Sequence, residues 1–416
     1  MDARLTINGG PNATTSYVGW APVPATLAQV PDNPPAPVNV TLRNKSSIGG
    51  QVVFAAAGSS NFTPTIALTL PANGAPVGLR IAGQFGAPSK ADGDAAIAVV
   101  EQASGKTLST TSLMVRVRKN ANTLTIAERN RFLSALATLN DAGAGPFSDY
   151  PNVHTDAGSP EAHDNPGFLA WHRAFLLDLE RELQAIDPSV SMHYWRFDLP
   201  APKVFRQTFM GVPTATGRLR FAAANPLQFW ATSSVPGIIR RPGFNAATQS
   251  AFVIDEATTL ALGGPTRQYG QFRSLEGNPH GSAHVSFTGA IRSIGTAATD
   301  PLFFMLHANV DRLWAKWQWL NKRFDVTKTS TFTPLGKAGS PGAARIGHNF
   351  QDTMWPWNQV TGFPRPPTAP GGQFPPSQLT NAPGLTPKVG DLIDYQGVRT
   401  PGTRLGFDYD DVPFEV

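Results

Sequence analysis

The placement of the histidines constrains this chain more than any other feature of its sequence. Six of the eight histidines form two groups of three, spaced nine and nine residues apart in the first group and four and 23 in the second. Neutral imidazoles without thiolates or carboxylates suit zinc, copper, iron or nickel. Two matched groups favour a pair of equivalent ions, for which copper is the preferred metal. The groups are His154, His163 and His172, and His280, His284 and His307.

A structural role for each histidine has to be weighed against metal binding. A single histidine on an apolar helix face is more often a hydrogen-bonded core residue than a ligand. The grouping reverses this expectation, because His280 and His284 lie four residues apart and would point the same way on a helix. A zinc peptidase needs Glu directly after the first of these histidines, whereas the chain has Gly281 there. His193 and His348 fit neither group, and we interpret both as structural.

Composition excludes several other classes of protein. A chain of 416 residues that is 41% hydrophobic is long enough for a large core and for two or more domains. The net charge is only +5, and the two signs are interspersed, so no nucleic-acid partner is expected. The complete lack of cysteine rules out disulfides, thiolate metal sites and cysteine nucleophiles.

The sequence gives no sign of a membrane or secretory segment. The first twenty residues lack a charged stretch followed by a continuous apolar run, and no apolar run is long enough to span a bilayer. We therefore expect no membrane partner and favour a cytoplasmic location.

Residues 1–120 are predicted to form an all-β accessory domain. Short segments with alternating apolar residues recur between turn-rich stretches, for example Ile66, Leu68 and Leu70. This pattern is typical of an antiparallel β-sandwich. The segment contains neither histidine nor cysteine, so it cannot supply the usual ligands of a transition metal.

Residues 121–416 are predicted to form a mainly α domain that carries the metal site. Thr125 and Glu128 form a capping-box signature at the start of its first helix. His172 lies at the edge of an apolar helical stripe, and His307 shares a predicted helix face with Phe303 and other apolar residues. Both groups of histidines are therefore expected on helices.

At these residues the chain resembles the type-3 dicopper proteins, which comprise tyrosinases, catechol oxidases and mollusc-type haemocyanins. The resemblance covers roughly residues 122–416, and its most specific parts are AHDNPGFLAWHRAFLLDLE, NPHGSAH and DPLFFMLHANVDRLWAKW. It implies a four-helix bundle whose facing helices hold two copper ions. The implied copper A ligands are His154, His163 and His172, and the implied copper B ligands are His280, His284 and His307.

The resemblance also implies roles for residues around the metals. Glu276 matches an acidic residue that holds a water near the copper pair and could act as a general base toward a phenolic proton; a solvated loop carboxylate is the alternative. Phe303 resembles a phenylalanine that faces bound aromatic rings, with a core role equally open. Asp311 could orient a ligand imidazole or form a salt bridge.

Three departures from the family pattern bear on activity. Gly281 stands where enzymes that hydroxylate monophenols often have Asn, and Leu306 stands where a second His is common. Without cysteine, the chain cannot form the crosslink to a copper A histidine found in many eukaryotic members, which favours a bacterial type. The resemblance therefore predicts a polyphenol oxidase that uses O2 to oxidise o-diphenols to o-quinones, and monophenols more weakly.

Two alternatives stay open beside this function. One is an O2-binding protein of the haemocyanin kind, although those are built from many repeated units and this chain has a single one. The other is an o-aminophenol oxidase, because the same centre can oxidise an ortho amino group. The expected partners are O2 and small phenolic substrates, with a copper-delivery protein considered in addition and the oligomeric state left open.

Overall fold

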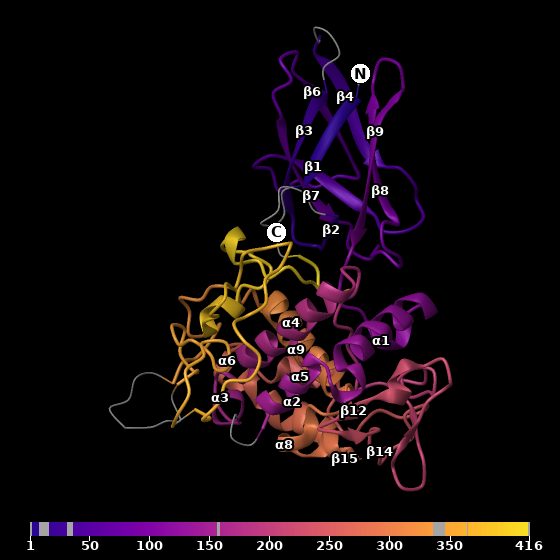
Figure 1. Cartoon of the computed structure of the whole chain (residues 1–416). Helices are drawn as coiled ribbons and strands as arrows, with labels where there is room; N and C mark the ends of the chain where they lie inside the picture. The colour runs from indigo at the N-terminus through magenta and orange to yellow at the C-terminus, as the bar shows by residue number, and fades with distance from the viewer. Residues whose placement is uncertain are drawn as a thin grey trace. The chain divides into compact units, whose positions relative to one another are not determined.

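The computed structural model of the chain describes residues 2–7, 16–30, 36–155, 159–335, 346–363 and 365–414. The chain forms two compact units (Figure 1). Unit 1 comprises Met1–Val117, Ser377–Ala382 and Gln396–Val416, and unit 2 comprises Arg118–Pro376 and Pro383–Tyr395. None of the helices in the described ranges is long and apolar enough to cross a membrane.

Unit 1 is built from two β-sheets, which confirms the β-rich N-terminal region. All neighbouring strands run antiparallel except β2 (Tyr17–Val18) and β9 (Thr107–Val115), which are parallel. One sheet has the order β1 (Asp2–Ile7), β3 (Val23–Val30), β7 (Val77–Gly83), β5 (Val52–Ala56). The other has the order β2 (Tyr17–Val18), β9 (Thr107–Val115), β8 (Ala95–Glu101), β4 (Val38–Asn44), β6 (Thr65–Leu70).

The core of unit 1 follows from the alternation of apolar residues along its strands. Successive side chains of a strand point to opposite faces of the sheet, so every second residue can be buried on one side. Val23, Ala25 and Leu27 of β3 are buried in this way, and they share one apolar cluster with Val40 and Leu42 of β4. Both sheets therefore contribute to a common core.

The C-terminal segment Gln396–Val416 groups with the β-strands of unit 1, which differs from the predicted division into residues 1–120 and 121–416. A buried carboxylate is one of the contacts that link this segment to unit 1: Asp408 accepts hydrogen bonds from the backbone N–H groups of Trp20 (2.8 Å) and Ala21 (3.3 Å). Its other oxygen accepts from the side-chain amide of Gln396 at 2.7 Å. The Trp20 indole donates to the Tyr409 carbonyl at 2.8 Å, which adds a second link.

Burial raises the pKa of Asp408 to about 6, so we predict a pH-dependent contribution to stability. An aspartate in the unfolded chain titrates near ~3.9. Because the folded pKa is the higher one, this contribution is fully present below about pH 4 and is lost as the pH rises through about 6. Asp408→Asn does not titrate, and its amide can donate to the Gln396 Oε1, which has no hydrogen-bond partner within the described ranges.

Urea unfolding at several pH values tests this prediction. Between pH 4 and 7 the free energy of unfolding of the wild type should fall by roughly 3 kcal/mol relative to the Asp408→Asn variant. Parallel curves for the two proteins would show that the carboxyl group is not protonated in this interval.

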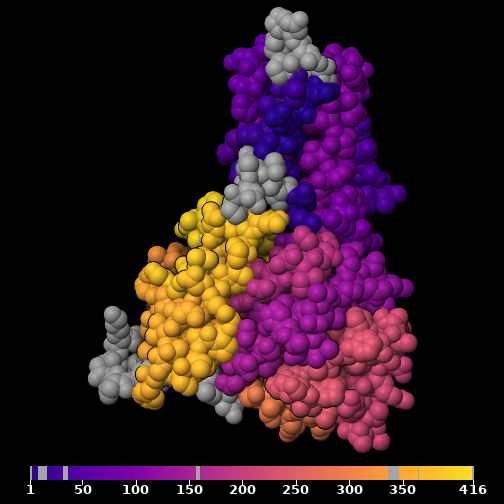
Figure 2. Space-filling view, in the orientation of Figure 1, coloured from indigo at the N-terminus to yellow at the C-terminus, as the bar shows by residue number. Residues whose placement is uncertain are grey.

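Unit 2 holds the helices, which confirms the mainly helical second region. Its helices are α1 (Ile126–Asn140), α2 (Asp149–Val153), α3 (Ser159–Ala162), α4 (Phe168–Ile186), α5 (Glu256–Ala261), α6 (Tyr269–Phe272), α7 (Ser282–Val285), α8 (Ile294–Ala297) and α9 (Leu302–Asn321). Its short strands are β10 (Val212–Pro213), β11 (Leu219–Arg220), β12 (Ala231–Thr232), β13 (Val235–Pro236), β14 (Arg240–Pro242) and β15 (Phe287–Gly289). The described residues between α9 and Pro376 lie on this unit mainly as loops, coloured orange to yellow (Figures 1 and 2).

Local sequence signals explain where the main helices begin and how they pack. Helix α1 starts with the predicted capping box: the Thr125 hydroxyl accepts from the Glu128 N–H at 3.2 Å, and the Glu128 carboxylate accepts from the Thr125 N–H at 2.9 Å. Helices α4 and α9 pack against each other and are almost wholly buried along their apolar faces. Their contact stacks the rings of His172 and His307, whose centroids lie 4.3 Å apart at 13°.

Candidate metal centre

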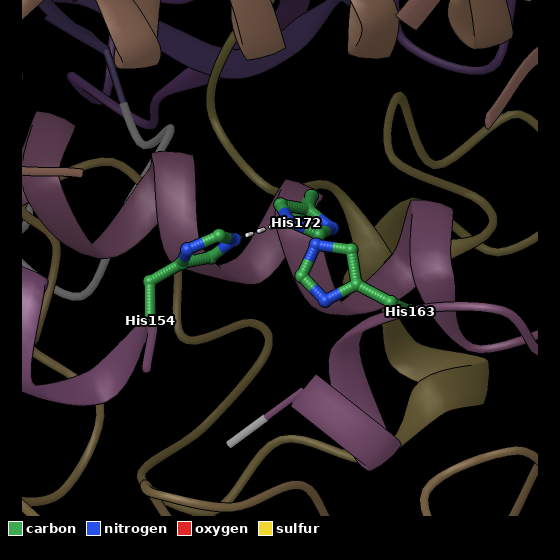
Figure 3. A group of neighbouring side chains, drawn as sticks. All are labelled: His154, His163 and His172. Carbon is green, nitrogen blue, oxygen red and sulfur yellow. Dashed lines mark hydrogen bonds between the residues drawn. The ribbon is translucent and has the colours of Figure 1, made fainter. Parts of the chain in front are cut away.

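The first histidine group assembles from three consecutive elements of unit 2 (Figure 3). His154 ends helix α2, His163 directly follows α3, and His172 lies in the second turn of α4. The Nε2 atoms of His154 and His172 are 3.4 Å apart. The ring of His163 lies 4.9 Å from that of His154 and 5.1 Å from that of His172, measured between centroids. The three rings therefore converge on one point.

The second group is carried by two adjoining helical turns and by α9. His280 lies in the π-helical turn η6 (Gly277–Gly281), His284 in α7, and His307 in α9. The His307 Nε2 is 3.2 Å from the Nε2 of His280 and 3.2 Å from that of His284. Their four-residue spacing predicted that His280 and His284 share one helix face; they do converge, although a break in helical geometry at Asn278 precedes them.

Backbone carbonyls fix the orientation of four of these rings. The Nδ1 atoms of His154, His172, His280 and His284 lie 2.7–3.0 Å from carbonyl oxygens of Ile294, Phe168, Glu276 and Ile291. A carbonyl can only accept a hydrogen bond, so each of these Nδ1 atoms carries the proton and each Nε2 presents a lone pair. Lone pairs that face each other this closely repel unless a cation lies between them.

The residues present therefore fit transition-metal ions. Imidazole nitrogens bind an ion such as zinc at about 2.0–2.1 Å, and two nitrogens that share a tetrahedral ion are then roughly 3.3 Å apart. The ligand atoms of each group lie within 4.8 Å of one another. A proton shared between two imidazoles cannot easily take the place of the metal ion. Burial lowers the pKa of His284 to about 4 and that of His172 and His307 well below the usual range, so these rings bind a proton weakly.

The segment from Ile291 to Ile294 contributes to both groups, a role that no residue type in the sequence indicates. The Ile291 carbonyl accepts from His284 at 2.7 Å, and the Ile294 carbonyl accepts from His154 at 3.0 Å. One short stretch of backbone thus orients a histidine of each group. Hydrogen bonds that orient a metal ligand tune the properties of the metal site. Every residue has a backbone carbonyl, so the sequence does not indicate which carbonyl has this role.

A cavity of about 550 Å³ opens beside the two groups. Four of the six histidines line it, namely His154, His163, His280 and His284. Its charged lining residues are Asp164, Arg273, Glu276 and Arg292, and its apolar lining residues are Val285, Ile294 and Ala297. This size lies within the range of about 300–1,000 Å³ in which small-molecule ligands bind.

Two of the predicted site residues, Glu276 and Gly281, line this cavity. The Glu276 carboxylate accepts from the Asp164 N–H at 2.6 Å and lies 3.8 Å from Arg273. Burial raises its pKa to about 7, so it can exchange a proton near neutral pH. A Cβ added at Gly281 would lie 3.3 Å from the Glu276 carbonyl oxygen, so a side chain there requires only a small shift.

Phe303, the third predicted residue, is fully buried and is not among the residues that line the cavity. Its ring centroid lies 4.2 Å from that of His307 and 4.7 Å from that of His154. It therefore packs against one histidine of each group and does not line the cavity. This position favours the core role over direct contact with a substrate ring.

Asp311 forms buried ion pairs, the second of the two roles considered for it. Its carboxylate accepts from Arg173 Nε at 2.6 Å and from Arg118 Nη1 at 3.1 Å. Arg118 also pairs with Glu180 at 2.7 Å. The Nδ1 of His307 has no hydrogen-bond partner within the described part of the chain, so Asp311 does not orient that ring.

Asp311→Ala should therefore destabilise the protein without removing copper. The substitution leaves Arg173 and Arg118 buried with one carboxylate fewer, which typically costs about 3–5 kcal/mol. The predicted result is a lower denaturation midpoint together with two copper ions per chain in the folded fraction. Loss of copper at full folding would instead assign Asp311 to the metal centre.

The two remaining histidines serve structural contacts, in agreement with the interpretation from sequence. His193 Nδ1 accepts from the Lys119 N–H at 3.3 Å. His348 Nδ1 accepts from the Gly167 N–H at 3.2 Å, and its Nε2 lies 3.1 Å from the Pro160 carbonyl. His348 thus supports the chain segment around His163 without facing the cavity.

Comparison with known proteins agrees with this site. Residues 144–320 match the family described as the common central domain of tyrosinase. The chain is 32% identical over 276 residues to a tyrosinase from Streptomyces antibioticus, covering 59% of this chain and 94% of that protein. A tyrosinase from Streptomyces lincolnensis is 30% identical over 270 residues, covering 58% and 92%. Deoxygenated hemocyanin from Rapana thomasiana matches with a TM-score of 0.49 and 19% identity, covering 71% of this chain and 70% of that one.

A protein with two histidine triplets, a cavity beside them and this sequence similarity falls in the type-3 copper class. The chain belongs to the tyrosinase family. It is accordingly a copper-dependent oxidase of phenolic compounds, with a dicopper centre as its cofactor.

Proposed function

We propose that this protein uses O2 to oxidise o-diphenols to o-quinones and acts more weakly on monophenols. The observation that carries the proposal is the composition of the cavity: it offers four of the six histidines and the carboxylate of Glu276, but only a glycine at position 281. A diphenol can be oxidised without a separate base, whereas a monophenol must first lose its hydroxyl proton.

The six histidines would hold the two copper ions, His154, His163 and His172 one and His280, His284 and His307 the other. When bound, the copper pair supplies the redox chemistry with O2. The chain itself positions these ligands, through the carbonyls of Ile291 and Ile294 and the stacked rings of His172 and His307. We further infer that the helices around them form the four-helix bundle typical of the family, and that the two sheets of unit 1 form a sandwich.

Glu276 is proposed to receive the phenolic proton of a monophenol. Its carboxylate is fixed by the Asp164 N–H, faces the cavity and has a pKa raised by burial to about 7. A general base is most effective when its pKa lies near the working pH. Gly281 gives no second polar side chain to help orient a water or the phenol, and for this reason deprotonation should limit monophenol turnover.

Two other functions remain as alternatives. An O2-binding protein of the haemocyanin kind would need the same histidines, but it has no use for a substrate cavity of about 550 Å³. An o-aminophenol oxidase would use the same centre and the same cavity, so only substrate comparison separates it from a diphenol oxidase. A copper-delivery partner and a cytoplasmic location are further proposals.

Oxygen consumption by copper-loaded protein tests the proposed function. Matched substrates are 4-methylphenol, 4-methylcatechol and 2-amino-4-methylphenol. We expect the catechol to be oxidised fastest. Fastest turnover of the aminophenol would favour the third function, and reversible O2 binding without turnover of any substrate would favour the haemocyanin-like one.

A further inference from the structure

Arg292 is a cation at the cavity that forms no ion pair with an acid in the part of the chain that the structure describes. It ends the 3-10 turn η7 (Ala290–Arg292) and lines the cavity. Its Nη1 donates to the backbone carbonyls of Val285 at 2.9 Å and Phe287 at 3.3 Å. No carboxylate in the described ranges forms an ion pair with it, and its Nε and Nη2 make no hydrogen bond to those residues.

Of the other three charged residues of the cavity, Arg273 and Glu276 face each other, and Asp164 meets both through its backbone. Arg273 lies 3.8 Å from the Glu276 carboxylate and 3.4 Å from the Asp164 carbonyl oxygen. Glu276 in turn accepts from the Asp164 N–H. Arg273, Glu276 and Asp164 therefore form a local group. Arg292 does not belong to this group, so its guanidinium is available to a ligand.

The position of Arg292 relates it directly to the metal centre. The preceding residue, Ile291, holds His284 through its carbonyl, and Val285, whose carbonyl anchors the guanidinium, directly follows His284 in α7. The apolar side chains of Val285, Ile294 and Ala297 line the same cavity. An aromatic ring next to His284 would thus contact an apolar surface with a fixed guanidinium at its edge.

We propose that Arg292 is a specificity-determining residue that binds the carboxylate of phenolic acids. This inference rests on the proposed function and names the substrate class. A guanidinium held through one nitrogen keeps its other edge for the two oxygens of a carboxylate, a geometry that Arg favours over Lys. The preferred substrates are catechols with a carboxylate on a short side chain.

The test compares two catechols that differ only in charge, 3-(3,4-dihydroxyphenyl)propionate and its primary amide. Two methylene groups separate the carboxylate from the ring, so the ring chemistry of the two compounds is closely similar. For the copper-loaded wild type, the KM of the acid should be about tenfold below that of the amide, a modest charge-assisted effect at a partly exposed site. In 0.5 M salt this ratio should shrink severalfold.

Variants assign the effect to the side chain. Arg292→Gln should bring the ratio of the two KM values to about one. Arg292→Lys should restore part of the preference for the acid, because Lys returns the positive charge but lacks the planar guanidinium that can bind both carboxylate oxygens. Arg241→Gln makes the same change of net charge at an exposed residue of β14 outside the cavity, and it should keep the wild-type ratio. If Arg292 only supports the backbone at Val285 and Phe287, Arg292→Gln will change both KM values equally, and the proposal is overturned.

A binding experiment separates failure of this inference from failure of the proposed function. 3-Phenylpropionate and its amide carry no hydroxyl group, so their dissociation constants do not depend on turnover. Tighter binding of the acid to wild type, lost in Arg292→Gln, supports the carboxylate site even if no phenol is oxidised. Equal affinities of the acid and the amide for the wild type would overturn it even if catechols react rapidly.

Discussion

His307→Ala should lower the copper content from two ions per chain to one and abolish oxidation of catechols. His307 supplies the nitrogen that faces both other members of its group, at 3.2 Å from each. Loss of outer contacts to a ligand typically costs about 10–100-fold in metal affinity or activity. Loss of a ligand itself should cost more, so we expect a decrease in activity of more than about 100-fold.

The control for this prediction is a second buried histidine. His193→Ala removes an imidazole of similar burial that contacts Lys119 and Phe132. It should reduce stability, since it creates a comparable cavity, yet keep both copper ions. Metal analysis and circular dichroism of both variants separate the two effects. Two copper ions in a folded His307→Ala protein would contradict the assignment of the second group.

The candidate metal centre could be predicted from sequence because its main signals are local. His280 and His284 are four residues apart, and His172 and His307 each lie in a long helix with a clear apolar face. Local periodicity determines which residues face inward on such helices. The first group was predicted from its two nine-residue spacings, and the resemblance added its assignment as the copper A ligands. Helical periodicity could not place His154 and His163, because each follows the end of a short helix.

Other features could not be predicted because they depend on contacts between distant segments or on backbone atoms. The carboxylate of Asp311 meets Arg118, 193 residues away. Asp408 binds the backbone at Trp20, 388 residues away, and this is one of the contacts between the C-terminal segment and the N-terminal part of unit 1. The carbonyls of Ile291 and Ile294 act through atoms that every residue has, so no residue type marks their role.

The second large effect is expected at Glu276. Glu276→Gln keeps an oxygen that can accept from the Asp164 N–H, which the carboxylate now does at 2.6 Å, but it cannot take up a proton. General-base contributions are typically about 100-fold or more. We therefore expect monophenol hydroxylation to fall by about 100-fold and diphenol oxidation to fall far less. Glu182→Gln, the same chemical change at a residue outside the cavity, is the matched control.

Gly281→Asn should have the opposite effect and raise the ratio of monophenol to diphenol rates. The backbone of Gly281 is helical, with φ −58° and ψ −38°, and an added Cβ meets only the Glu276 carbonyl oxygen at 3.3 Å. An Asn side chain can therefore enter the cavity next to His280 and add a polar group near the proton acceptor. In the double variant with Glu276→Gln this gain should vanish, because the Asn only assists a base that is no longer there. A wild-type protein that hydroxylates monophenols as fast as it oxidises catechols would contradict this interpretation of Gly281, since deprotonation would then be efficient without the second group.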